Sequence, residues 1–336
     1  MTDILIPSNK QNIVLDATML TAIMKCGRYA DLQYVNNLQP IKGKSNSLEI
    51  GSIIHKFLEV YYGNQMKGIG KTQALGFGMS AVELYISGCK ECTNFESIHH
   101  LNDNSETHVC TEECITKPKC GHPINEYPGL QNTPAESEGY ATGWKFALQT
   151  CDEYAKFWQS DFWVTVDVET VRSKVLYEDD EIRILWKAKL DWIVDTNNGI
   201  FPCDHKTMKQ NRDSVSINNQ FMGQCRMMDT RNVFINKIGL QKTLKPEDKF
   251  KRVAISYSAA RLMEWQSVVL PYWAKTLVAY SNQEYYPPNF NSCEGKYGKC
   301  NFYEVCESDP EMRVEVLKAN FYVGTAWNPT NQSNDE

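Results

Sequence analysis

The chain has 336 residues, of which 42% are hydrophobic and 23% are charged, as in an ordinary soluble globular protein. Its formal net charge of −6 argues against a surface coated in basic residues, so contact with nucleic acid has to come from a local groove. No apolar run approaches the roughly 20 residues of a membrane span, and the N-terminus lacks the apolar stretch of a secretion signal. We therefore expect a cytoplasmic protein with no membrane partner.

Apolar periodicity predicts helices in the first part of the chain, over residues 17–36, 48–62, 72–87 and 139–160. A polar segment rich in Cys, His, Asn and Pro interrupts them at 88–138 and is interpreted as an insertion. Runs rich in β-branched residues predict strands at 162–170, 181–195, 199–204, 232–238 and 252–257. Further helices are expected at 216–229 and at 259–281, the second interrupted at Pro271. This order predicts an α/β fold with a mixed central sheet flanked by helices, in a single domain spanning 1–336 with a flexible tail at 327–336.

One predicted hairpin carries residues suited to phosphodiester hydrolysis. Asp191 lies on its first strand, Asn197–Gly199 form the turn, and Asp204 and Lys206 lie on its second strand. Side chains on one face of a hairpin lie about 5 Å apart, so the two carboxylates would bind one hard cation such as Mg²⁺ or Mn²⁺. Lys206 is two residues from Asp204 and faces the same side. An aspartate and a lysine at this spacing are also common on a solvated strand edge, but the tight turn and apolar lead-in favour the catalytic interpretation.

This pattern resembles the PD-(D/E)xK nuclease superfamily, in particular its RecB-like branch. Members of that branch carry Gly-x-x-x-His on an upstream helix, which Gly51 and His55 match, and a glutamine motif on the helix after the Asp-x-Lys strand, which Gln220 matches. The resemblance covers roughly residues 17–306 outside the insertion. It implies a restriction-endonuclease-like core, Lys206 as a catalytic residue, and a divalent metal bound by His55, Asp191, Asp204 and the main-chain carbonyl of His205.

Two positions depart from the family pattern. Ala188 stands where the family usually has glycine, and Gln224 where it usually has tyrosine, so contacts of Gln220 and Gln224 with substrate phosphate are a weaker expectation. A lone histidine on an amphipathic helix is more often packed or on the surface, and it is the surrounding motifs that favour His55 as a ligand. Glu169, on the strand before the hairpin, would either add negative charge near the metal or be a solvated strand residue, and we favour the solvated alternative.

Twelve cysteines in a chain without a secretion signal point to metal or cluster ligation, because disulfides are rare in a reducing compartment. Cys293, Cys300 and Cys306 form a compact group, and Cys26 supplies the fourth thiolate that a [4Fe–4S] cluster needs. One cysteine near the N-terminus and three near the C-terminus resemble the iron–sulfur nucleases of the RecB-like branch, such as AddB and the Cas-four type exonucleases. In that case the cluster ties the two termini together. Zinc in the same four positions, or unrelated thiols, are the alternatives.

The insertion has the ligand types and spacing of a zinc site, although it matches no motif of the family. A bound Zn²⁺ would also explain how so polar a segment becomes ordered. The candidate zinc ligands are Cys89, Cys92, Cys110, Cys114 and Cys120.

Together these residues predict a metal-dependent DNA nuclease. It is expected to be an exonuclease acting on single strands or DNA ends in recombination, repair or CRISPR-type DNA processing. A compact free-standing nuclease of this kind is typical of a phage. The metal would lower the pKa of a bound water, and Lys206 would stabilise the charge that develops on the phosphate. The alternative is a DNA-end-binding recognition subunit with weak or no cleavage, acting with protein partners in recombination or CRISPR adaptation. A third possibility is a zinc- and thiol-rich scaffold without nucleic-acid function. We disfavour it, because it would make the spacing of Asp191, Asp204 and Lys206 a coincidence.

Overall fold

The computed structural model describes residues 10–41, 46–87, 138–208, 218–295 and 298–324. The expected flexible tail at 327–336 lies outside these ranges. The expected zinc ligands also lie outside these ranges: Cys89, Cys92, Cys110, Cys114 and Cys120. The zinc site therefore stays a prediction.

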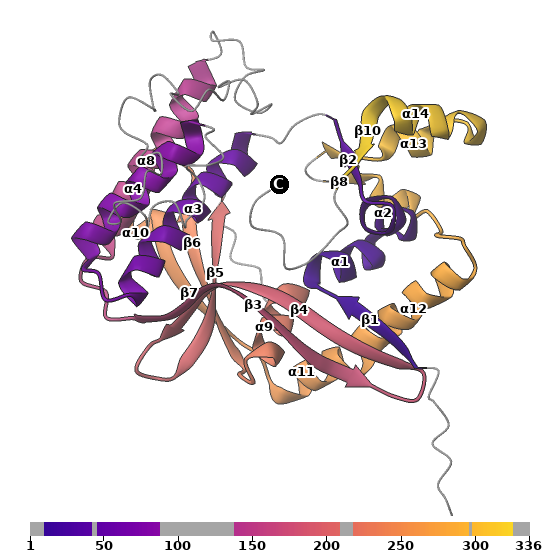
Figure 1. The fold of residues 1–336 in the computed structure, drawn as a ribbon, viewed down its shortest axis with the longest axis horizontal. Coiled ribbons are helices and arrows are strands. Elements are labelled where there is room, and N and C mark those ends of the chain that lie inside the picture. Colours follow the sequence, from indigo (N-terminus) through magenta and orange to yellow (C-terminus); the bar gives the residue numbers. More distant parts are fainter. Residues whose placement is uncertain (1–9, 42–45, 88–137, 209–217, 296–297, 325–336) are drawn as a thin grey trace, which may run out of the picture.

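A six-stranded mixed sheet lies in the middle of the described structure (Figure 1). Its strands are β1 (Gln11–Leu15), β3 (Val164–Glu178), β4 (Ile182–Asp195), β5 (Ile200–Met208), β6 (Asn232–Gly239) and β7 (Phe250–Ser256). Their order is β1-β4-β5-β6-β7, and β3 pairs with β4. The β1–β4 and β5–β6 pairs are parallel and the others are antiparallel. The expected α/β class, with a mixed sheet flanked by helices, is confirmed.

Helices cover the sheet from two sides (Figure 1). On one side α3, α4 and α8 pack around Trp192 of β4, and on the other α1, α9, α11 and α12 pack around Trp186. The bounds of these helices are α1 (Ala17–Lys25), α3 (Asn46–Met66), α4 (Lys71–Ser87), α8 (Glu138–Phe157), α9 (Asn219–Met227), α11 (Ala259–Glu264) and α12 (Leu270–Asn282). An untwisted strand would direct both tryptophans to one face, because they are six residues apart. The β3–β4 ribbon is therefore strongly twisted between them, and Asp191 lies in that twisted segment.

The first predicted helix is divided in three. Asp16 caps α1 by accepting a hydrogen bond from the Met19 amide, and α1 ends at Cys26, whose backbone is extended with φ −168° and ψ 123°. The chain then forms α2 (Gly27–Ala30) and a π-helical turn, η1 (Asp31–Val35). The break places Cys26 at a corner between two helices and not on a helix face.

The helix predicted at 259–281 runs without a break from α11 through a π-helical turn, η4 (Trp265–Val269), into α12. Pro271 does not interrupt it. The proline stands in the first turn of α12, after the wider π turn, where its missing N–H is tolerated.

The C-terminal segment packs against the N-terminal helices (Figure 1). Strand β10 (Phe321–Val323) pairs antiparallel with β2 (Leu38–Pro40), and Leu32, Phe302, Val305 and Phe321 form a small core of their own. The remaining short elements are α10 (Pro246–Lys249), η5 (Phe290–Ser292), β8 (Glu294–Gly295), β9 (Gly298–Lys299), α13 (Tyr303–Glu307), η6 (Pro310–Met312) and α14 (Arg313–Asn320). The sequence did not predict β1, β2 or β10.

Candidate active site

Helix α3 crosses β5 at a glycine. A Cβ on Gly51 would lie 3.0 Å from Thr207 Oγ1, so a larger residue here would press on the Thr207 side chain. His55 follows about one turn later and points to the end of β4, where its Nδ1 lies 3.9 Å from Asp191 Oδ2. The small residue at position 51 thus lets α3 pack closely on β5 one turn before His55.

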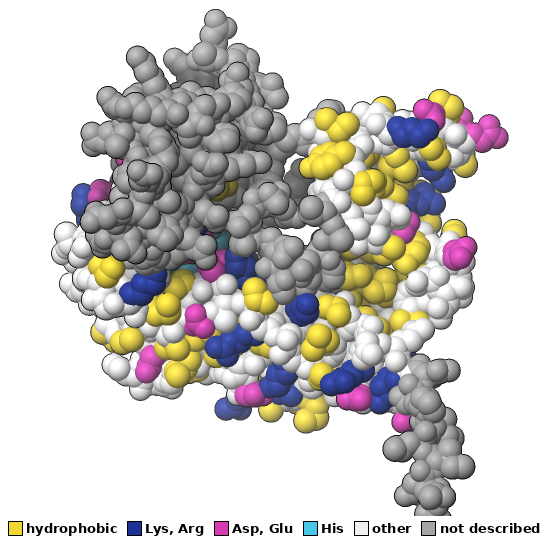
Figure 2. Space-filling model, in the orientation of Figure 1, with side chains coloured by type: hydrophobic (Ala, Val, Ile, Leu, Met, Phe, Trp, Pro, Cys, Tyr) yellow, Lys and Arg dark blue, Asp and Glu magenta, His cyan; other side chains and the backbone are white. Residues whose placement is uncertain are grey.

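Three side chains from separate elements converge beside this contact. His55, Glu169 and Asp191 each offer one ligand atom, and the three atoms lie within 4.8 Å of one another. Two carboxylates and an imidazole are ligands suited to Mn²⁺ or Mg²⁺, and they come from α3, β3 and β4. In Figure 2, histidine, acidic and basic side chains lie next to one another near the middle of the drawn face.

Glu169 belongs to this group, so the expectation of a solvated strand residue was wrong. It stands between the pairs Val168↔Trp192 and Thr170↔Leu190, and therefore opposite Asp191. Its φ of 51° is left-handed, and its carboxylate forms an ion pair of 2.5 Å with Lys189. Burial, together with the negative charge of Asp191, raises the pKa of Glu169 to about 7. This position depends on the register of β3 against β4, which the sequence pattern alone does not reveal.

The hairpin expected for the aspartates is present. Strands β4 and β5 pair from Asp195↔Ile200 to Trp192↔Cys203, and Asp191 and Asp204 are the next residues on each strand. Burial and the neighbouring Asp204 raise the pKa of Asp191. The two carboxylates are therefore close enough to repel each other when both are charged, the arrangement that a cation would relieve.

Asp204 is fully buried and held by α9. Its Oδ1 accepts hydrogen bonds from Gln220 Nε2 at 2.6 Å and Gln224 Nε2 at 3.2 Å. Its Oδ2 lies 2.7 Å from Lys206 Nζ and forms an ion pair with it. The angles of this contact are not those of a hydrogen bond, so Oδ2 accepts no hydrogen bond from the described residues. Here the two glutamines contact a carboxylate of the protein, and their contact with a substrate phosphate stays a prediction.

Lys206 is fixed between two side chains. Its Nζ lies 2.7 Å from Asp204 Oδ2 and donates a hydrogen bond to Gln220 Oε1 at 3.2 Å. Burial acts to lower the pKa of Lys206, but the carboxylates of Asp204 and Asp191 outweigh burial and raise it. The side chain therefore carries a positive charge beside the carboxylate group.

His205 supports the site through its backbone. Its amide donates to Asp191 Oδ2 at 2.9 Å, and its ring packs beside the stacked rings of Tyr62 and Trp192. Asn236 Nδ2 lies 2.8 Å from His205 Nδ1, so the Asn236 amide fixes the orientation of the ring. Burial and the neighbouring His55 lower the pKa of His205 well below its usual range, so the ring is neutral.

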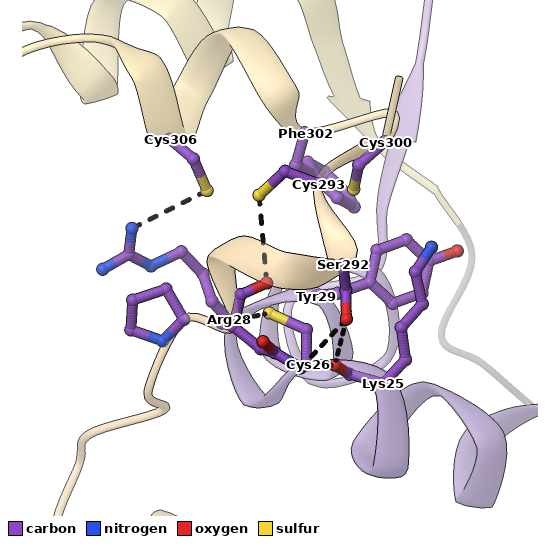
Figure 3. A pocket seen from close by; sticks show the side chains of 11 residues that line it. Lys25, Cys26, Arg28, Tyr29, Ser292, Cys293, Cys300, Phe302 and Cys306 are labelled. Atoms are coloured by element: carbon purple, nitrogen blue, oxygen red, sulfur yellow. Dashed lines mark hydrogen bonds between the residues drawn. The ribbon is translucent and has the colours of Figure 1, made fainter. Parts of the chain in front are cut away.

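The four cysteines expected to bind a cluster line one pocket (Figure 3). The first and last of them, Cys26 and Cys306, are more than 250 residues apart in the chain. Figure 3 shows Cys26 at the corner after α1, facing Cys293, Cys300 and Cys306 across the pocket. The Asn289 amide donates to Cys26 Sγ at 3.2 Å, and Arg28 Nη1 donates to Cys306 Sγ at 3.7 Å.

No family model matches the chain, and no curated protein matches it. Among solved structures, the crystal structure of SSO0001 matches 51% of this chain and 74% of its own, with 14% identity and a TM-score of 0.29. This similarity is too low to carry an argument. None of the helices in the described part of the chain combines the length and apolar character needed to cross a membrane.

Proposed function

We propose that the protein is a metal-dependent nuclease with a restriction-endonuclease-like core of the RecB-like kind. The observation that carries the proposal is the convergence of His55, Glu169 and Asp191 next to the Asp204–Lys206 ion pair. A divalent cation and a fixed positive charge near the phosphate both promote hydrolysis of a phosphodiester, and this arrangement supplies sites for both.

The residues fit a divalent metal. His55, Glu169 and Asp191 would hold it, and the buried Oδ2 of Asp204 offers a further oxygen that has no hydrogen bond among the described residues. A cation would also offset the repulsion that raises the pKa values of Glu169 and Asp191. When bound, Mg²⁺ or Mn²⁺ supplies a water of lowered pKa as the nucleophile. The proposed ligand set thus adds Glu169 to the residues that the family resemblance implied.

The chain's own residues orient the reacting groups. Gln220 and Gln224 hold the Asp204 carboxylate in place, and Asp204 in turn holds the Lys206 ammonium. A cation fixed in this way needs no reorganisation to stabilise negative charge on a phosphate. The His205 amide fixes one oxygen of Asp191, so both aspartates are preorganised by hydrogen bonds.

We also propose a [4Fe–4S] cluster bound by Cys26, Cys293, Cys300 and Cys306. The donor set is four cysteines around one pocket, with N–H donors at two of the sulfurs. A cubane binds each thiolate to a different iron, so thiols spread around a cavity suit it better than a single Zn²⁺, whose four ligands lie at about 2.3 Å from one point. When bound, the cluster supplies a covalent connection between α1 and the C-terminal segment.

The test is cleavage of end-labelled single- and double-stranded DNA with Mg²⁺ or Mn²⁺, using protein purified without oxygen. Lys206→Ala is expected to lower the rate by at least about a hundredfold, as for removal of one preorganised transition-state donor. Lys318→Ala, at an exposed lysine of α14, is the matched control and should leave the rate unchanged. Equal rates for wild type and Lys206→Ala would contradict the proposal.

The same experiment distinguishes a nuclease from the alternative, a recognition subunit that binds DNA ends. Its result would be well-folded, metal-loaded wild type that binds end-labelled DNA and cleaves none of it. The product ladder of an active wild type gives the polarity, and cleavage of closed circular DNA would exclude strict exonuclease action.

A further inference from the structure

Strand β4 carries a second set of basic residues next to the candidate active site. Lys187 and Lys189 alternate with Trp186, Ala188 and Leu190, and Lys189 contacts Glu169 on the side where Asp191 lies. Lys187 and Lys189 alternate with the buried Trp186, so they lie on the ribbon face opposite this tryptophan, and the contact of Lys189 with Glu169 places that face beside the candidate active site.

The described residues leave this face of the ribbon exposed. Val171 and Ser173 lie opposite Lys189 and Lys187 on β3, and both are exposed, Val171 by 40%. The other face carries Trp186, which is 1% exposed and packs with α9 and η4. A ligand can therefore approach the two lysines along the strand without displacing a helix of the described structure.

The two lysines differ in their partners. Lys189 is fixed by Glu169 at 2.5 Å and its side chain is only 13% exposed. Lys187 is partly buried and makes no ion pair with another described residue. Lys187 thus has no carboxylate partner among the described residues.

A phosphate approaching this site meets three carboxylates, those of Glu169, Asp191 and Asp204, which repel it. Lys206 offsets part of this repulsion at the reacting phosphate, but it does not extend along the strand.

We propose that Lys187, on the exposed face of the β3–β4 ribbon, binds a backbone phosphate of a DNA single strand next to the reacting phosphate. The inference rests on the proposed nuclease function and names the path that its substrate takes. Phosphate contacts fix the register of a nucleic acid without reading its sequence, so this site would serve a nuclease of low sequence preference.

The test measures binding and not cleavage. The dissociation constant of a fluorescein-labelled single-stranded oligonucleotide is measured by anisotropy without divalent metal, at several KCl concentrations. Lys187→Gln is expected to reduce the slope of log Kobs against log [KCl] by about 0.7 and to weaken binding roughly fivefold at 0.1 M KCl. Lys187→Arg should keep the wild-type slope.

Lys174→Gln is the matched control, because Lys174 lies on the neighbouring strand but bonds to Asp229 and the Arg226 carbonyl on the α9 side. An unchanged slope in Lys187→Gln, or an equal change in Lys174→Gln, would overturn the inference. If wild type cleaves DNA while Lys187→Gln binds normally, only this inference fails. If wild type neither binds nor cleaves, the proposed function fails with it.

Discussion

Glu169 has a backbone conformation that residues with a Cβ avoid. Its φ of 51° lies in the interior of β3, whereas the other described non-glycine residues with positive φ stand at turns or element ends: Asn37, Asn197, Asp229 and Glu284. Such a conformation costs about 1–3 kcal/mol and persists only where its surroundings fix it. Here the ion pair with Lys189 fixes the side chain, and the strained backbone directs the carboxylate to His55 and Asp191.

If Glu169 is a metal ligand, Glu169→Gln should weaken Mn²⁺ binding by at least about tenfold, the lower range for disturbing a metal site. Isothermal titration calorimetry with Mn²⁺ measures this affinity. Glu178→Gln, at an exposed carboxylate near the end of the same strand, is the control and should bind Mn²⁺ like wild type. Equal affinities in the two variants would mean that Glu169 serves only to neutralise Lys189.

The sequence predicted much of the site but not Glu169. The spacing of Asp191, the Asn-Gly turn, Asp204 and Lys206 is local, so it can be read from one hairpin. The location of Glu169 depends on pairing across two strands, and β3 has register shifts at Thr165/Asp167 and Val175/Tyr177. Counting alternate residues along such a strand does not show which of them meets Asp191.

At the scale of elements, α9 depends on one close contact with the sheet. A Cβ on Gly223 would lie 2.5 Å from Trp186 Cζ2, and Trp186 is fully buried in the core beneath α9. The glycine lets α9 approach the sheet, and this approach brings Gln220 and Gln224 to Asp204. The position of the whole helix is thus part of the site.

Gly223→Ala should lower the free energy of unfolding by about 1–3 kcal/mol, because the added methyl group overpacks the contact with Trp186. Gly76→Ala, on the exposed face of α4, should raise it by about 0.5–1 kcal/mol, because nothing lies within 4 Å of the added Cβ. Urea unfolding measures both. Changes of the same sign in the two variants would contradict the packing described for α9.

Asp179 stabilises the turn between β3 and β4. Its Oδ1 accepts hydrogen bonds from the amides of Ile182 and Glu181, and Lys275 forms an ion pair with its Oδ2. These contacts hold the pKa of Asp179 well below its usual value. A depressed carboxyl pKa contributes stability that is present above the unfolded-state value and is lost as the pH falls towards the folded-state value.

Asp179→Asn should therefore melt at a lower temperature than wild type at pH 7, and the difference should shrink as the pH falls below about 4. Thermal unfolding followed by circular dichroism at pH 7 and pH 3 gives both differences. A difference that stays constant across this range would show that the charge of Asp179 does not stabilise the turn.

At the scale of the whole molecule, the two ends of the described chain are joined in more than one way. The β2–β10 pair and the small core around Phe302 join them by hydrogen bonds and apolar contact, and the four cysteines face one another beside that core. Of these connections between the N-terminal and C-terminal segments, the sequence predicted only the one through the cysteines. Strands of three residues with partners more than 280 positions away leave no local pattern, which is why β2 and β10 were missed.

If the proposed cluster is bound, removal of its iron from anaerobically purified protein should loosen the C-terminal segment and leave the sheet intact. After chelation, hydrogen exchange is expected to become faster in β2, β10 and α13, while the amides of β4 and β6 keep their protection. Cys300→Ser should reproduce the effect without a chelator. Unchanged exchange in both cases would mean that the strand pair and the small core suffice to hold the segment.

The central claim is that one divalent metal binds among His55, Glu169 and Asp191, and anomalous diffraction from crystals soaked in Mn²⁺ tests it most directly. If the metal binds there, we expect an anomalous peak within ligand distance of all three side chains, beside Asp204. We expect no such peak in crystals of Glu169→Gln soaked at the same concentration. A peak elsewhere on the protein, or an empty site at Mn²⁺ concentrations that support cleavage, would contradict it.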